Sequence, residues 1–346
     1  MKAPARRVWV VAVLALFAAA AAFASGSKEA LTFVWIPNDS VPEAKTFRTA
    51  IDKVISDAIG RPVVDKLTTD YNIAIEAMAT DNAALAYFGG LQYVQTHQKN
   101  AKVIPLVTNS GDSGTMSDAQ YFSRISVKTG DAPQYMTSGS YSIENIQGKR
   151  FAFVSNSSTS GFLFPSSGIV GYFSKKPAWS ALKPNDLIEG GQGKFFSQVV
   201  FGGSHQGSAA ALLTDKVDAA AFDDTDLSAY VDLVSGTEST PGAVYKVKDG
   251  AAQPFDTLVG KSFTVLWSIP VLNGPICANQ NLLTADELKK IVAALTADST
   301  SMNPSIFFPP DYKGPNKADF TQTGKVKFLA VDDSTYQPIR DKLQGQ

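Results

Sequence analysis

The sequence predicts an α/β protein built from two lobes. Short apolar runs alternate with stretches of helical periodicity, polar loops follow many of the apolar runs, and the same rhythm starts again near residue 151. This alternation is typical of mostly parallel sheets covered by helices. The chain has 346 residues, of which 44% are apolar and 18% charged, so it is long enough for two domains with sizeable cores.

The first half contains the first α/β series. The apolar run at 31–36 predicts a buried strand that ends at Pro37, and the helical pattern over 43–59 ends at Gly60-Arg61-Pro62. Further strands and helices follow in alternation. The expected strands are 63–64, 83–88, 103–107 and 121–127, and the expected helices are 71–79 and 91–97.

The second half repeats the pattern. Its expected strands or extended segments are 151–154, 198–201, 217–222, 263–269 and 275–278, and its expected helices begin after Gly161 and cover 208–214. Thr284 and Glu287 form a capping-box pattern that opens a helix running to about residue 296. Four prolines in 300–325 suggest a long surface segment.

The N-terminus has the pattern of a secretory signal peptide. Three basic residues precede the apolar run 8–22, which closes with Ala22-Phe23-Ala24. The alternative is a membrane anchor, but the run is shorter than the ~20 residues that span a bilayer. We therefore expect a signal peptide over 1–24 and export to the periplasm or beyond.

Composition excludes several classes of function. Residues 25–346 hold 28 Lys and Arg against 32 Asp and Glu, without a basic block, so we expect no nucleic-acid partner. Cys277 is the single cysteine, which rules out an intramolecular disulfide. His97 and His205 are the only histidines, so a Cys/His metal site is not expected, and we predict neither a metal nor a cofactor.

A cluster of hydroxyls follows the strand at 151–154. The segment FVSNSSTSGFLFPS places Ser157, Ser158, Thr159 and Ser160 directly before an expected helix. Free N–H groups at a helix N-terminus, together with hydroxyl donors, form an anion site without Lys or Arg. The alternative is an ordinary helix cap with additional serines.

A second polar loop, in FGGSHQGSAAALL, contains His205. We expect His205 either to be structural or to donate to an anion, most favourably when protonated. A secreted serine hydrolase using Ser160 or Ser204 with His205 is a competing possibility. Neither serine lies in a G-x-S-x-G motif, so we expect a binding protein rather than an enzyme.

Four segments, in order, resemble the substrate-binding proteins of phosphonate ABC transporters. They are TDYNIAIEAMATDNAALAYFGGLQYV at 69–94, AQYFSRISV at 119–127, SSTSGFLFP at 157–165 and GGSHQGSAAALLTDKVDAAAFDDTDL at 202–227. The last two are specific, and the resemblance covers roughly residues 31–300. It implies a type II periplasmic binding fold, with two α/β lobes joined by crossing hinge strands and the ligand in the cleft.

The resemblance also implies a division of the chain and a set of ligand contacts. Lobe 1 would comprise 30–122 plus 272–346, and lobe 2 would comprise 123–271. Ser158, Thr159, Ser160, Tyr71, Tyr121 and His205 would bind the phosphonate oxygens. A membrane permease would be the partner.

The tail of the ligand is less well defined by the resemblance. Aminoethylphosphonate binders of this family hold an ammonium with two carboxylates. One position corresponds to Thr225, between Asp224 and Asp226, and the other falls in Leu272-Asn273-Gly274-Pro275, which has no carboxylate. The ligand is therefore expected to be a phosphonate, phosphite or phosphate. Another phosphorylated small molecule on the same fold is the remaining alternative.

Overall fold

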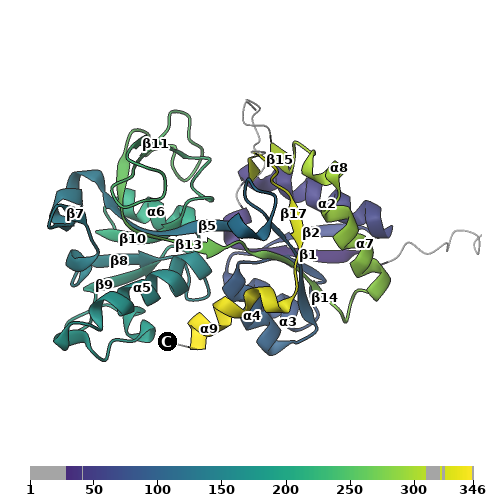
Figure 1. Ribbon diagram of the computed structural model, residues 1–346, viewed down its shortest axis with the longest axis horizontal. Coiled ribbons are helices and arrows are strands. Elements are labelled where there is room, and N and C mark those ends of the chain that lie inside the picture. The colour runs from purple at the N-terminus through teal and green to yellow at the C-terminus, as the bar shows by residue number, and fades with distance from the viewer. Residues whose placement is uncertain (1–28, 41, 309–319, 322–323, 345–346) are drawn as a thin grey trace, which may run out of the picture.

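The computed structural model describes residues 29–40, 42–308, 320–321 and 324–344. The signal peptide expected over 1–24 lies outside this range. Two lobes lie side by side, with strands β5 (Gln120–Lys128) and β13 (Ser262–Leu272) running between them (Figure 1). Within the described part of the chain, no helix combines the length and the apolar character needed to cross a membrane.

Lobe 1 contains a six-stranded sheet in the order β17-β4-β14-β3-β1-β2. Its strands are β1 (Leu31–Trp35), β2 (Val63–Leu67), β3 (Leu85–Tyr87), β4 (Val103–Asn109), β14 (Pro275–Asn279) and β17 (Phe328–Ala330). Its helices are α2 (Lys45–Ile59), α3 (Tyr71–Ala79), α4 (Gly90–Lys99), α7 (Ala285–Leu295), α8 (Asp298–Ser301) and α9 (Gln337–Gln344). Phe33 and Trp35 pack with α2 and α7, while Val34 packs with α3, α4 and α9, so helices cover both faces.

Lobe 2 contains a seven-stranded sheet in the order β11-β12-β13-β5-β10-β8-β9. Its remaining strands are β8 (Arg150–Phe153), β9 (Gln198–Phe201), β10 (Ala219–Asp223), β11 (Val231–Ser235) and β12 (Val244–Val247). Helix α5 (Phe164–Phe173) packs on one face and helix α6 (His205–Leu213) on the other. Two small sheets pair β6 (Met136–Thr137) with β7 (Ser140–Tyr141), and β15 (Phe307–Phe308) with β16 (Phe320–Thr321).

Several predicted elements are confirmed. The helix expected at 71–79 is α3, and the strand expected at 198–201 is β9. The capping box before α7 has both of its hydrogen bonds, from the backbone of Glu287 to Thr284 and from the backbone of Thr284 to Glu287. The apolar spacing and the capping residues give clear local signals at these positions, so the sequence pattern and the fold agree.

The prediction of mostly parallel sheets is wrong. Parallel pairing joins β1 to β2 and β3, and β8 to β9 and β10, while the other pairs of the two large sheets are antiparallel. The reason is the crossing of the chain between lobes: β5, β13 and β14 run against their neighbours. The parallel pairs lie where the polar loops follow the strands.

Two further expectations need correction. Helix α6 begins at His205 rather than at Ser208, so His205 is a helix residue and not a loop residue. The segment 300–325 was expected on the surface, but Ile306 and Phe307 are fully buried in the core of lobe 1. Ile306 and Phe307 therefore place this part of the segment in the core.

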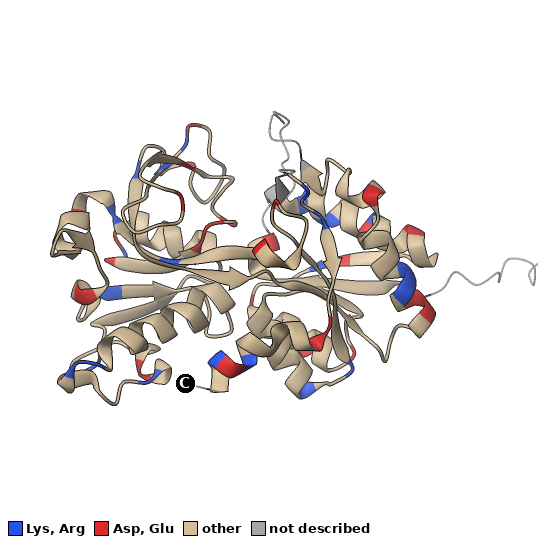
Figure 2. Ribbon diagram, viewed as in Figure 1, with Lys and Arg blue, Asp and Glu red and all other residues tan. Residues whose placement is uncertain are grey.

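The crossing strands β5 and β13 pair along their length, from Lys128 with Phe263 to Gln120 with Leu272. Their pairing links the lobes through a continuous ladder, consistent with a hinge. The division of the chain at 122/123 and 271/272 remains a prediction. Charged residues, coloured on the ribbon of Figure 2, are distributed over both lobes without a large block of one sign.

Candidate functional site

Polar groups from both lobes meet where the parallel strands end. In lobe 2, β8 is parallel to both β9 and β10, so the three carboxyl ends lie at one edge of the sheet. The segments after these strands contain most of the residues singled out from the sequence. Lobe 1 contributes residues after β1 and at the start of α3 and α4. Ligands of open α/β sheets bind at such edges.

Four consecutive residues after β8, Ser157, Ser158, Thr159 and Ser160, form what we call the hydroxyl loop, and all four are buried. Ser158 caps the following helix, because its Oγ accepts the N–H of Gly161 at 3.0 Å. The first turn, Thr159–Leu163, is π-helical and continues into α5. Capping therefore accounts for Ser158 alone and leaves the other hydroxyls for other contacts.

Close packing fixes the position of this loop. A Cβ at Gly161 would lie 2.3 Å from Cγ2 of Val154, which only glycine avoids. Val154 and Leu163 belong to the same apolar cluster as Phe88 and Leu91 of lobe 1. The hydroxyl loop is thus pressed against the opposite lobe, and its backbone has little freedom.

Two tyrosine hydroxyls reach the hydroxyl loop. Tyr71, the first residue of α3, donates to Oδ1 of Asn38 at 2.8 Å and lies close to the side chain of Ser158. Tyr121, on β5, lies close to the side chain of Ser160. Burial and the carboxylates of Asp223 and Asp226 raise the pKa of both phenols, so both remain protonated and able to donate.

Direct hydrogen bonds join the hydroxyl loop to lobe 1. Oγ1 of Thr159 accepts the N–H of Leu91, at the start of α4, at 2.9 Å. Oγ of Ser157 donates to Oδ1 of Asn72 at 3.0 Å. These contacts indicate that Thr159 and Ser157 connect the lobes, whereas Ser160 faces the interior of the site.

His205 has a defined tautomer. Its Nδ1 accepts the backbone N–H of Asp223 at 2.9 Å, which places the proton of the neutral ring on Nε2. Nε2 lies 3.4 Å from Oγ of Ser160 and 3.4 Å from Oδ2 of Asp223. Burial lowers the pKa of His205 to about 3, so the ring is a neutral donor and not the protonated donor that we expected.

This tautomer argues against the serine-hydrolase alternative. A serine nucleophile needs a histidine nitrogen with a free lone pair to take its proton. In this site Nε2, the nitrogen near Ser160, already carries a proton, and Nδ1 is occupied by a backbone N–H. The other candidate, Ser204, uses its hydroxyl to cap α6 by accepting the N–H of Gly207 at 3.0 Å.

Asp223, Asp224, Thr225 and Asp226 form a second segment, the acidic turn, at the end of β10. Asp224 points away from the hydroxyl loop: it accepts the N–H of Phe122 at 2.8 Å and the hydroxyl of Ser239 at 3.2 Å, and it pairs with Arg124 at 3.6 Å. Thr225 is exposed. Of the three residues expected near the ligand tail, the structure brings Asp226 to the site and leaves Asp224 and Thr225 outside it.

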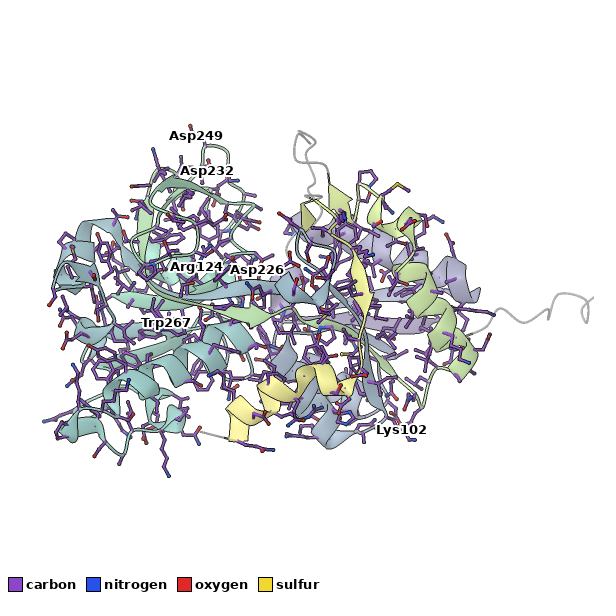
Figure 3. The ribbon with its side chains drawn as sticks, in the orientation of Figure 1. Lys102, Arg124, Asp226, Asp232, Asp249 and Trp267 are labelled. Carbon is purple, nitrogen blue, oxygen red and sulfur yellow. The ribbon has the colours of Figure 1, made fainter. Side chains whose placement is uncertain are left out.

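Asp223 is a site residue that the sequence analysis missed. Its Oδ2 lies 3.5 Å from Oγ of Ser160, and its Oδ1 accepts the N–H of Asp226 at 3.0 Å. Burial, reinforced by the charge of Asp224, raises the pKa of Asp223 to about 7. An acidic residue ending the apolar strand 219–222 was the available indication. Asp226 lies on the side of lobe 2 that faces lobe 1 (Figure 3).

Asn38 was also missed. It follows β1, is buried, and its Oδ1 accepts from the hydroxyl of Tyr71 and, at 3.3 Å, from the backbone N–H of His205. One amide oxygen thus connects residues of both lobes. The polar run Pro37-Asn38-Asp39-Ser40 at the end of a buried strand was the indication in the sequence.

The ligating atoms of His205, Asp223 and Asp226 lie within 4.8 Å of one another, a spacing that a metal ion can use. The tautomer opposes this use, because metal binding at Nε2 would move the ring proton to Nδ1, against the N–H of Asp223. We therefore interpret the cluster as a donor beside two carboxyl groups.

The chain is similar to known proteins in family, sequence and fold. The family model described as "ABC transporter, phosphonate, periplasmic substrate-binding protein" matches residues 33–336. A curated relative, the phosphate-import protein PhnD of Mycolicibacterium smegmatis, is 27% identical over 204 residues, which are 58% of this chain and 57% of the relative. The matched region therefore spans little more than half of that relative.

Two solved structures share the fold. A binding protein component of an ABC phosphonate transporter from Pseudomonas aeruginosa has a TM-score of 0.62 at 20% identity, covering 91% of this chain and 86% of its own. PhnD1 from Prochlorococcus marinus, solved with methylphosphonate, has a TM-score of 0.62 at 17% identity, covering 91% and 97%.

Proposed function

The chain belongs to the family of periplasmic substrate-binding proteins of phosphonate ABC transporters, and on this premise we propose that it captures a phosphonate-type oxyanion between its lobes. It would deliver the anion unchanged to a membrane permease. The family acts outside the cytoplasm. The export pattern in residues 1–24 supports a periplasmic location for this member.

The observation that carries the proposal is the convergence of neutral donors from both lobes. Tyr71 comes from lobe 1, Ser160 and His205 follow strands of lobe 2, and Tyr121 lies on the crossing strand β5. A tetrahedral oxyanion offers several acceptor oxygens to such a set. Each hydrogen bond to a charged group contributes roughly 1.5–3 kcal/mol, so a few of them suffice for tight binding.

The remaining members of the predicted set have supporting roles in this proposal. Ser158 caps the helix and lies close to Tyr71, and Thr159 joins the lobes through Leu91. When the lobes close on the anion, these hydrogen bonds between the lobes would form as well. Hinge closure of this kind is a common response of two-lobed binding proteins.

A short ligand is favoured over one with a long cationic tail. Asn273 stands in the segment where the family's second carboxylate is expected, and its side-chain amide donates to the backbone oxygen of Asn109 at 2.8 Å. Thr225 stands at the first position and is exposed. Methylphosphonate, phosphite and phosphate are the preferred candidates, ahead of aminoethylphosphonate.

Titration calorimetry with these four anions tests the proposal. We expect at least one of the three short anions to bind, and Ser160→Ala to weaken that binding strongly. Ser180→Ala removes a hydroxyl that donates to the backbone oxygen of Pro177 on the surface of lobe 2, and it should leave affinity unchanged. Absence of binding by all four anions to the folded wild-type protein would overturn the proposal.

A further inference from the structure

Two carboxyl groups lie where the proposed function requires an anion. Asp223 is buried and stands 3.5 Å from the hydroxyl of Ser160 and 3.4 Å from Nε2 of His205. The carboxyl of Asp226 stands 3.9 Å from the same imidazole nitrogen, and its backbone N–H donates to Oδ1 of Asp223 at 3.0 Å. The hydroxyl of Ser160 and the Nε2 N–H of His205, which are expected to hold the ligand, thus also lie next to carboxyl groups.

The charged and titratable groups around Asp223 do not form a charged ion pair with its carboxyl group. From β5, Arg124 is within electrostatic range, but its guanidinium pairs with Asp224 and donates to Ser239 and Tyr245 at 2.7 and 3.0 Å. His205, on α6, is neutral. Tyr121, on β5, and Tyr71, on α3, are protonated and therefore also carry no charge. Asp224 and Asp226 add negative charge from the acidic turn itself.

A fully ionised dianion would therefore face two carboxylates at short range in a buried site. Like charges placed together in an interface cost several kcal/mol, which the neutral donors would have to overcome. A shared proton removes the conflict. If the ligand brings a P–OH group, a carboxylate accepts its hydrogen bond, and what was a repulsion becomes a strong charge-assisted bond.

We propose that Asp223 and Asp226 make the site selective for an oxyanion that is bound together with one acidic proton, held between the carboxyl pair and a ligand oxygen. This inference rests on the proposed function and narrows its substrate class. Phosphonates, phosphite and phosphate can supply or share such a proton near neutral pH. Sulfate cannot supply it, since it is fully ionised there, and can only accept the proton that Asp223 itself carries below about pH 7.

Distance separates this role from the recognition of an ammonium. An ammonium at the end of a carbon tail lies several bonds from the phosphonate oxygens, so its carboxylates should stand apart from the oxygen donors. Asp223 instead contacts Ser160 and His205 directly. The carboxyl pair is therefore placed against the head of the ligand.

The sign of the pH dependence follows from proton linkage. The complex retains one proton. Above the pKa of Asp223, about 7, and above the second ionisation of the ligand, neither free partner carries that proton. Binding must then take up a proton, and affinity falls roughly tenfold for each pH unit. Whether the proton resides on the carboxyl or on the ligand does not alter this count.

The test measures affinity by calorimetry from about pH 6 to about pH 9, with methylphosphonate, phosphate and sulfate, in wild type, Asp223→Asn and Asp226→Asn. Asparagine keeps the acceptor oxygen that holds the N–H of Asp226 and adds an N–H donor. Asp232→Asn is the matched control, because it makes the same charge change at an exposed position of lobe 2 (Figure 3).

For the wild type and Asp232→Asn we expect binding of at least one phosphorus oxyanion that weakens above about pH 8. At about pH 8, where Asp223 is mostly ionised, we expect sulfate to bind at least roughly a hundredfold more weakly. For Asp223→Asn we expect the alkaline fall to flatten and sulfate to gain about tenfold or more relative to the phosphorus oxyanion. His205→Gln, which keeps an uncharged donor, should retain the alkaline fall.

Three results would overturn the inference while leaving the proposed function intact: sulfate binding as well as phosphonate at about pH 8, affinity that holds steady or rises to pH 9, or an alkaline fall lost in His205→Gln. Aminoethylphosphonate, added to the series, tests the alternative that the carboxyl groups hold an ammonium. If aminoethylphosphonate binds far more tightly than methylphosphonate and Asp223→Asn removes that preference, the carboxyls hold an ammonium instead. If an asparagine variant fails to fold, the wild-type pH series and sulfate comparison still decide.

Discussion

The hydroxyl loop after β8 and the acidic turn after β10 end neighbouring parallel strands, yet they are built on opposite electrostatic principles. The hydroxyl loop is neutral, and its hydroxyls bond to the N–H of Gly161 at the helix start and to Asn72 and the N–H of Leu91 in the other lobe. The acidic turn concentrates three carboxyl groups and depends on Arg124 and on protonation to be stable.

In the function that we propose, this difference lets one edge of a sheet both attract and select an anion. Neutral donors bind any oxyanion of suitable size through hydrogen bonds. Because these donors do not titrate near neutral pH, this attraction does not depend on pH there. Carboxyl groups at the same place reject anions that cannot bring or share a proton. In this account affinity resides in the hydroxyl loop and the tyrosines, and discrimination resides in the acidic turn.

Removing Arg124 should be the most damaging change to the acidic turn. Its side chain is 1% exposed and is paired with Asp224. Breaking a buried pair leaves an uncompensated charge and typically costs about 3–5 kcal/mol. We expect Arg124→Met to lower the free energy of unfolding, measured by urea denaturation, by this amount. Arg150→Met, which breaks a half-exposed pair with Asp218 in the same sheet, should lose only about 1 kcal/mol. Equal losses would mean that Arg124 does not stabilise the turn in this way.

Within the hydroxyl loop, Ser160 and Ser157 provide a matched comparison. Ser160 faces His205 and Asp223, so Ser160→Ala should weaken anion binding by roughly 1.5–3 kcal/mol. Ser157 bonds to Asn72 across the lobes, so Ser157→Ala should weaken binding by about 0.5–1.5 kcal/mol, through closure alone. Calorimetry with the best ligand measures both. A larger loss for Ser157→Ala would reverse these roles.

Asp223→Asn should stabilise the ligand-free protein, by an amount that depends on pH. Burial raises the pKa of Asp223 to about 7, above the ~3.9 of an unfolded aspartate, so ionisation destabilises the fold as pH rises between these values. Asparagine avoids this penalty. We expect little difference near pH 4 and a gain of about 0.5–2 kcal/mol at pH 8. A variant that is less stable than wild type at pH 8 would contradict this account.

Much of the fold could be predicted from the sequence where local patterns were strong. The helix at 71–79 has its apolar spacing, and the helix after Thr284 has its capping box. The direction of β5, β13 and β14 could not be predicted, because no local pattern reports that a chain crosses between lobes and returns. The same limit applied to the segment around Ile306, whose burial depends on distant residues.

The candidate site shows the same division. Clustered hydroxyls and a resemblance to a family indicated Ser160, Tyr121 and His205, and the structure brings them together. Asp223 was missed, because the sequence does not reveal which carboxylates of an acidic run turn inward. The tautomer of His205 was equally hidden, since it depends on a backbone N–H that lies eighteen residues away in the sequence.

A crystal structure of the complex with methylphosphonate near pH 7 tests the central claim most directly. We predict ligand oxygens within hydrogen-bond distance of Ser160, Tyr121 and Nε2 of His205, and one ligand oxygen in a short bond of about 2.5–2.7 Å with a carboxyl oxygen of Asp223 or Asp226. A ligand bound elsewhere would contradict the assignment of the site. A ligand held by the hydroxyl loop but turned away from both carboxyl groups would contradict the selection of a proton-bearing anion.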